Sequence, residues 1–93
     1  MNKLKENTYK LALAKFGEMA QINMVFEESA ELQKELCKYL RGEKNENKIA
    51  EEIADVRIML EQMELHFDIE KEIKEIMIEK VNRLKLRIVG MDV

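Results

Sequence analysis

The sequence predicts an all-α protein, built as an antiparallel four-helix bundle. The chain of 93 residues contains only 3 glycines and no proline, which leaves too few turn residues for a β-sandwich or a β-barrel. Its 46% hydrophobic and 38% charged residues, with only 5% aromatic, are typical of helices that carry apolar and charged faces. We therefore expect one domain over residues 1–93.

Two helices are predicted in the first half of the chain. Apolar residues at helical spacing before Gly17, with Asn7 or Thr8 as the N-cap, predict a helix over 8–16. The next apolar stripe predicts a helix over 18–40. Arg41 followed by Gly42 is a typical helix end, because the cation complements the helix dipole and glycine adopts the left-handed conformation.

Two more helices are predicted in the second half. After a polar loop over 43–47, apolar residues recur at i, i+4 and i+7 and predict a helix over 46–66. Asp68 is then expected to cap a last helix that stops at Gly90. The loops interrupt any heptad pattern, so separate bundled helices are favoured over one long coiled coil.

Charge and cysteine content exclude several classes of function. The net charge of −3, from 16 basic and 19 acidic residues, disfavours a nucleic-acid-coating protein. Cys37 and His66 are the only residues of their kinds, so neither an internal disulfide nor a zinc cluster is expected. With no signal-peptide core and no run of about 20 apolar residues, we expect a cytoplasmic protein without a membrane partner.

Two acidic pairs stand at i, i+3 spacing on consecutive helices. They are Glu28 with Glu31, and Glu52 with Asp55. This spacing turns both carboxylates of a pair toward one point, and oxygen-rich sites suit hard cations such as Mg²⁺. The same spacing is also common on ordinary solvated helix surface. The position of both pairs at the edge of an apolar stripe favours a cation site.

A basic stripe lies near the end of the chain. Lys80, Arg83 and Arg87 share one ridge of the last predicted helix, and Lys48 precedes the second acidic pair by one turn. Cations there can simply complement a helix C-terminus. Together with the acidic pairs, however, they indicate a site for a metal-bound polyphosphate.

The acidic pairs and their surroundings resemble a known family. Segment 16–32, with Glu27, Glu28 and Glu31, looks like the first motif of the MazG-like all-α nucleoside triphosphate pyrophosphohydrolases. Segment 52–56 is similar to their second motif after a gap of 20 residues. The resemblance covers about residues 11–87 and is strongest to short, single-domain, phage-type members.

The resemblance implies an enzyme that cleaves (deoxy)nucleoside triphosphates to monophosphate and pyrophosphate, as nucleotide-pool house-cleaning. It implies Mg²⁺, with Mn²⁺ as a substitute, held by four ligands: Glu28, Glu31, Glu52 and Asp55. Mg²⁺ would activate the attacking water. Glu27, Glu28 and Glu31 would be the catalytic carboxylates, and Lys48, Lys80, Arg83 and Arg87 would bind the phosphates. Tyr9, Phe16 and Tyr39 are the candidates for stacking on the base.

Other assignments remain open at this point. The resemblance also implies a homodimer or a dimer of dimers, and a chain this short buries only about 60–65% of its unfolded surface by itself. Two alternatives are a non-catalytic helical dimerisation module and a dedicated dUTP or phosphoribosyl-ATP pyrophosphohydrolase. Metal dependence separates the first alternative from an enzyme, and a substrate panel separates the second.

Overall fold

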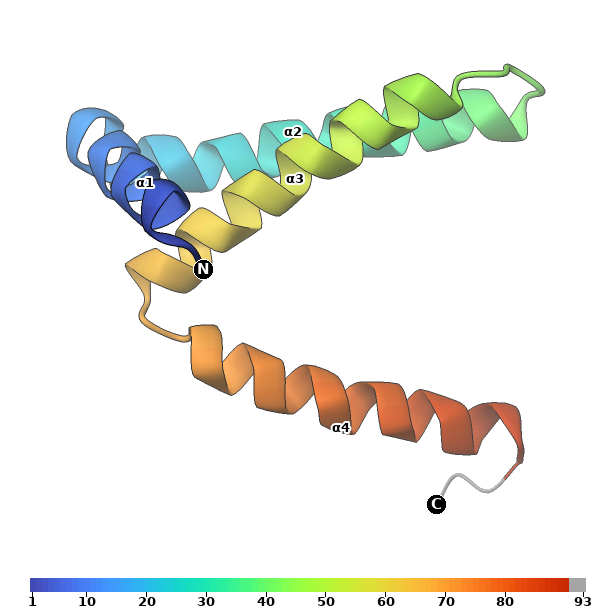
Figure 1. Cartoon of the computed structure of the whole chain (residues 1–93). Coiled ribbons are helices and arrows are strands. Elements are labelled where there is room, and N and C mark those ends of the chain that lie inside the picture. Colours follow the sequence, from blue (N-terminus) through green and yellow to red (C-terminus); the bar gives the residue numbers. More distant parts are fainter. Residues whose placement is uncertain (91–93) are drawn as a thin grey trace.

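Four helices make up the computed structural model, which describes residues 1–90 and has no strand among them. They are α1 (Lys3–Phe16), α2 (Glu18–Leu40), α3 (Glu46–His66) and α4 (Glu70–Ile88). Figure 1 shows α2 and α3 side by side as an antiparallel hairpin, with α1 across one end and α4 projecting away. The predicted all-α class is confirmed. Among the described residues, α1, α2 and α3 pack on one another, whereas α4 contacts α3 and, through a 2.9 Å ion pair of Glu70, the amino group of Met1.

The first helix begins earlier than the sequence pattern predicts. Asn2 is its N-cap, and the Asn2 side-chain oxygen accepts a 2.8 Å hydrogen bond from the backbone N–H of Lys5. The predicted cap at Asn7 or Thr8 is wrong, since both residues lie inside α1 and the Thr8 hydroxyl donates to the Leu4 carbonyl at 2.7 Å. The first turn does not contribute to the buried face of the helix, since its apolar residue Leu4 is exposed, so the apolar pattern gives no signal there.

A single glycine separates α1 from α2. Gly17 has φ 88° and ψ 164°, a conformation that is essentially restricted to glycine. Its N–H still donates to the Leu13 carbonyl, and its own carbonyl accepts from the N–H of Gln21. Gly17 is therefore both the C-cap of α1 and the N-cap of α2, and the chain changes direction at this one residue. The predicted break at Gly17 is confirmed.

The hairpin loop between α2 and α3 is closed by a glycine and a buried polar contact. Gly42 lies in the left-handed region, with the 3.2 Å bond from Glu43 N–H to the Lys38 carbonyl that marks a Schellman motif. The Asn45 amide donates to both the backbone and the side-chain oxygen of Glu35, each at 2.9 Å. These bonds fix the alignment of α2 against α3, on which the acidic pairs lie.

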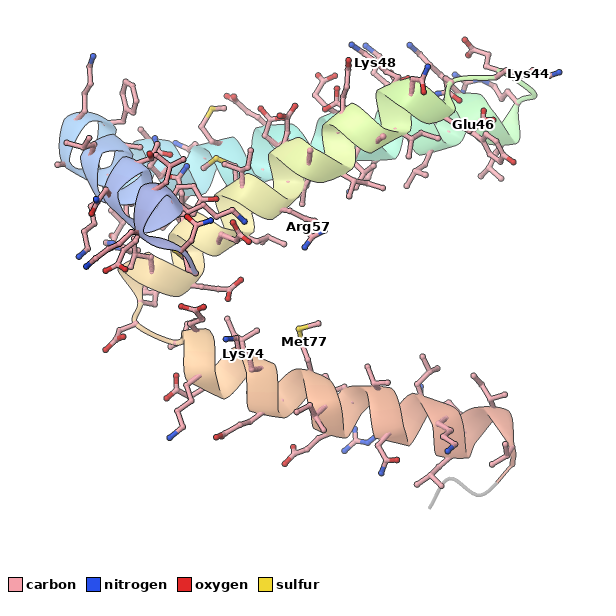
Figure 2. The ribbon with its side chains drawn as sticks, in the orientation of Figure 1. Lys44, Glu46, Lys48, Arg57, Lys74 and Met77 are labelled. Carbon is pink, nitrogen blue, oxygen red and sulfur yellow. The ribbon has the colours of Figure 1, made fainter. Side chains whose placement is uncertain are left out.

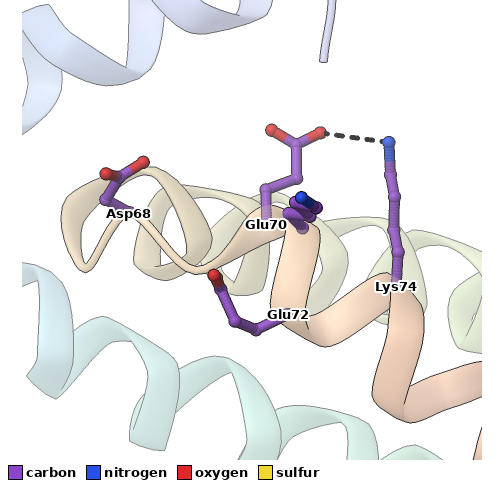
Figure 3. A pocket seen from close by; sticks show the side chains of 5 residues that line it. Asp68, Glu70, Glu72 and Lys74 are labelled. Carbon is purple, nitrogen blue, oxygen red and sulfur yellow. Dashed lines mark ion pairs between the residues drawn. The ribbon is translucent and has the colours of Figure 1, made fainter.

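The junction of α3 and α4 differs from the prediction. Asp68, expected to cap the last helix, instead has φ 55° and ends α3, with Ile69 N–H bonded to the Glu64 carbonyl at 3.0 Å. No side chain caps α4. Figure 3 shows the shallow hollow at this junction, where Glu70 forms a 3.7 Å ion pair with Lys74.

Burial within one chain is slight. Tyr9 and Met59 are the buried apolar residues, and no side chain among residues 1–90 is completely enclosed. Nothing in α4 is buried, although its apolar side chains include Ile76, Met77, Val81 and Leu84. None of the helices in the described part of the chain is long and apolar enough to cross a membrane.

Candidate metal centre

Three carboxylates from the two predicted motifs meet between α2 and α3. Glu28 comes from α2, whereas Glu52 and Asp55 come from α3 and stand one helical turn apart. Each residue offers an oxygen within 4.8 Å of the oxygens of the other two. The antiparallel hairpin thus brings together side chains that are 24 and 27 positions apart in the sequence, counted from Glu28 to Glu52 and Asp55.

The three carboxylates differ in exposure. Glu52 is buried, with 8% of its surface exposed; Glu28 is half-buried and Asp55 is exposed. Burial raises the pKa of Glu28 above its ordinary value, and the negative charges of Asp55 and Glu52 raise this pKa further. The negative form of Glu28 is therefore less favourable in the folded chain than in water, and a nearby cation would offset that cost.

The donor set fits a hard divalent cation. All three ligand groups are carboxylates, which are the preferred ligands of Mg²⁺ and Ca²⁺. Mg²⁺ holds oxygens at 2.0–2.1 Å in an octahedron, so opposed ligands are about 4.2 Å apart and adjacent ligands about 3 Å apart. The three oxygens lie within 4.8 Å of one another, so side-chain rotations that draw them closer together would bring them to that spacing.

The two other predicted acidic residues lie beside this group. Glu31 is exposed and stands outside the set of three close carboxylates, although its charge also raises the pKa of Glu28. Glu27 is exposed too, and it acts on Glu28 in the same direction. A fourth ligand position for Glu31 and the catalytic roles of Glu27, Glu28 and Glu31 remain predictions.

Lys48 lies on the same helix as Glu52 but pairs with a different acid. Its ammonium is 3.4 Å from Glu51, and this contact raises the pKa of Lys48, with a smaller contribution from the charge of Glu52. In Figure 2, Lys48 and Arg57 point from α3 in opposite directions, and Arg57 faces the side on which α4 lies. Of the predicted phosphate-binding cations, Lys48 is thus the one that interacts electrostatically with a carboxylate of the group, Glu52, within one chain.

The remaining predicted cations lie on another part of the molecule. Lys80, Arg83 and Arg87 are exposed residues of α4. Figure 1 shows α4 leaving the end of α3 and running apart from the α2–α3 hairpin, so the structure of one chain does not bring this stripe to the three carboxylates. Phosphate binding by these residues remains a prediction.

A groove that was not predicted opens beside the carboxylates, between α1, α2 and α3. Its lining contains the carboxamides of Gln21 and Gln62, both buried, and also Glu27. The sequence gives one indication that Gln62 is buried. On the helix it falls beside Met59 and Met63, at the edge of the apolar stripe of α3. That signal is weak because glutamine is also common on solvated helix surfaces.

Comparison of the chain with family models, with curated proteins and with solved structures gave no match.

Proposed function

We propose that the chain hydrolyses (deoxy)nucleoside triphosphates to the monophosphate and pyrophosphate in a divalent-cation-dependent reaction, as nucleotide-pool house-cleaning. The observation that supports this most is the meeting of Glu28 with Glu52 and Asp55, with oxygens within 4.8 Å of one another. One carboxylate of the first half of the motif that resembles the MazG-like family, Glu28, thus lies with both carboxylates of the second half across one hairpin.

Glu28, Glu52 and Asp55 hold the cation in this proposal, with Glu31 as the fourth ligand. Mg²⁺, or Mn²⁺ in its place, would supply Lewis-acid chemistry there, which suits the attack of water on the α-phosphorus. Glu27 or Glu31 accepts the proton of the attacking water, since both carboxylates are exposed and lie in the same stretch of α2 as the ligand Glu28. Lys48 offsets negative charge on the phosphates.

A second copy of the chain completes the fold in this proposal, as a homodimer or a dimer of dimers. Support comes from α4, an amphipathic helix of 19 residues with no buried residue. Packing this helix against a second chain removes its apolar side chains from water. It also gives Lys80, Arg83 and Arg87 of one chain access to the carboxylates of the other, which they do not reach within their own chain.

Pyrophosphate release from a panel of canonical and damaged nucleotides, with and without Mg²⁺, tests the activity. Glu52→Gln is expected to abolish release, because it removes the buried ligand. Glu46→Gln is the matched control, since it removes one charge from an exposed residue of the same helix outside the group. A panel without any pyrophosphate release, or equal rates in the two variants, would show that the activity is wrongly assigned.

A non-catalytic dimerisation module is the second candidate, and the exposed apolar face of α4 favours it. A module of this kind is indifferent to the carboxylates. If Glu52→Gln and Asp55→Asn leave Mg²⁺-dependent thermal stability unchanged and no nucleotide is consumed, this second function is the correct one. A response confined to dUTP or phosphoribosyl-ATP within the panel would identify a dedicated hydrolase instead.

A further inference from the structure

The groove between α1, α2 and α3 has the size and walls of a small-molecule site. Its volume is about 570 Å³, within the range of about 300–1,000 Å³ that ligand pockets occupy. Phe16, Met24 and Met59 give it apolar walls, and an aromatic ring with two thioethers is well suited to the face of a planar ring. The other lining residues are Ala12, Ala20, Gln21, Asn23, Glu27 and Gln62.

The groove begins one helical turn from the carboxylates. Met24 precedes Glu28 by four residues in α2, and Met59 follows Asp55 by four residues in α3. The two helices are antiparallel, so both steps lead toward the end where α1 lies, by roughly 5.4 Å per turn. The groove is therefore within reach of the next part of a molecule whose phosphates lie at the carboxylates.

One polar atom of the lining lacks the partner that its burial requires. Gln62 is only 6% exposed, and its side-chain oxygen is buried without a hydrogen-bond donor. The amide nitrogen of the same side chain makes only a 3.7 Å contact to the sulfur of Met59. A buried carbonyl oxygen without a donor destabilises the folded chain, because its hydrogen bonds to water are lost and not replaced. Such an oxygen beside a groove is expected where a ligand supplies the N–H.

We propose that this groove binds the nucleobase of the substrate, with the Gln62 oxygen accepting an N–H from the edge of the base. The inference rests on the proposed function, which places the phosphates at Glu28, Glu52 and Asp55. No lysine or arginine occurs among the lining residues, and Glu27 repels anions, so the lining disfavours a phosphate in the groove. Carboxamides bind base edges through paired donors and acceptors, and Gln21 and Asn23 add two more of them.

Binding of uncharged nucleosides to the metal-free chain tests the groove apart from the carboxylates. Adenosine, cytidine and uridine are titrated in the presence of EDTA, and the side-chain amide signals of Gln62 and Gln21 are followed by two-dimensional NMR. At least one nucleoside is expected to shift both signals in a saturable manner. Ribose alone is expected to leave them unchanged, because the planar ring and its N–H edge are what the groove holds.

Gln62→Met separates a binding role from a structural role. The variant keeps the length of the side chain and removes an oxygen without a donor, so its melting temperature is expected to equal or exceed that of the parent chain. Its nucleoside affinity is expected to fall about tenfold, which corresponds to one lost hydrogen bond. Gln33→Met, at an exposed position of α2, is the matched control and keeps the parent affinity.

Several outcomes would overturn the inference. They are the absence of nucleoside-induced shifts at Gln62, an equal response to ribose, and equal affinities for the Gln62→Met and Gln33→Met variants. Shifts that follow protein dilution instead of nucleoside would assign the groove to a second copy of the chain. Nucleoside binding without pyrophosphate release contradicts the proposed function alone, whereas release with unchanged Gln62 signals contradicts the groove alone.

Discussion

The phenolic hydroxyl of Tyr9 donates a 2.5 Å hydrogen bond to a carboxylate oxygen of Glu61, which ties α1 to α3. Tyr9 is 5% exposed and is one of the buried apolar residues of the chain. The ammonium of Lys5 lies 3.3 Å from the same carboxylate. Since α1 also forms one wall of the groove, this pair helps to hold the groove open beside α2 and α3.

Tyr9→Phe is expected to lower the free energy of unfolding by about 1.5–3 kcal/mol, the usual contribution of a hydrogen bond to a charged group. The ring remains in place, so the loss reports the hydroxyl and not the packing. Urea unfolding followed by circular dichroism measures it. Lys5→Met is the companion variant, and its loss is expected to be smaller because its ammonium is exposed. Equal losses would contradict the dominance of the tyrosine bond.

The same pair predicts a loss of stability in strong alkali. Burial, followed by the bond to Glu61, raises the pKa of Tyr9 from 10.0 to about 12. A raised pKa means that the folded state holds the proton more tightly, so this stabilisation is complete below pH 10 and disappears as the pH rises toward 12. The difference in urea midpoint between the parent chain and Tyr9→Phe should shrink across that interval. A constant difference from pH 8 to pH 12 would contradict the prediction.

The hairpin loop supplies a third prediction. The Glu35 carboxylate is buried, and the hydrogen bond from the Asn45 amide, ahead of the contact with Lys38, lowers its pKa. Asn45→Ala removes that donor and should lower the urea midpoint, whereas Asn47→Ala, at an exposed position of α3, should leave it nearly unchanged. Because the pKa of Glu35 is lowered, its contribution is present at neutral pH and is lost as the pH falls through the lowered pKa. The effect of Asn45→Ala should therefore decrease in acid.

Asp68 occupies the left-handed backbone conformation, which is energetically unfavourable for any residue that has a Cβ atom. Its φ of 55° ends α3, so Asp68→Gly is expected to raise the free energy of unfolding by about 0.5–1 kcal/mol. Asp68→Ala should lower it, because alanine has no polar side chain to stabilise this conformation locally. Thermal unfolding of the three chains is expected to rank them Gly, Asp, Ala in decreasing melting temperature. Any other order would show that the backbone conformation is not the controlling factor.

Helix type and most boundaries could be predicted because they depend on local chemistry. Apolar stripes and the Gly17 and Gly42 breaks predicted the bounds of α2 and α3 as the structure has them. Asp68 was misread because aspartate is common both at helix starts and in left-handed turns, and the sequence alone does not separate the two. The start of α1 was missed because an exposed first turn carries no apolar period.

The candidate site could be predicted only in part, because its geometry also depends on how the helices pack. Spacing places Glu52 and Asp55 on one ridge, and an antiparallel hairpin then brings Glu28 opposite them. Periodicity defines the face of a helix without defining what packs against it. The resemblance implied that Lys80 and Arg83 bind phosphates held at the carboxylates, but α4 projects away from them within one chain, so this role stays a prediction. Gln62 was missed because its burial depends on the crossing of α1 over the hairpin.

Glu28→Gln is expected to have opposite effects with and without a divalent cation. Burial and the charges of Asp55 and Glu52 raise the pKa of Glu28, so its negative form destabilises the metal-free chain at neutral pH. In EDTA at pH 7, the variant should therefore melt above the parent chain.

With Mg²⁺ at 100 times its Kd, the parent chain should gain about 2.7 kcal/mol of stability, while the variant, with one ligand removed, should gain much less. For a domain of this size the parent gain corresponds to a rise of roughly 10–20 °C in melting temperature. Glu64→Gln, which removes a charge of α3 outside the group, is the control and should respond to Mg²⁺ as the parent chain does. If Mg²⁺ raises the melting temperature of Glu28→Gln as much as that of the control, Glu28 does not hold the cation.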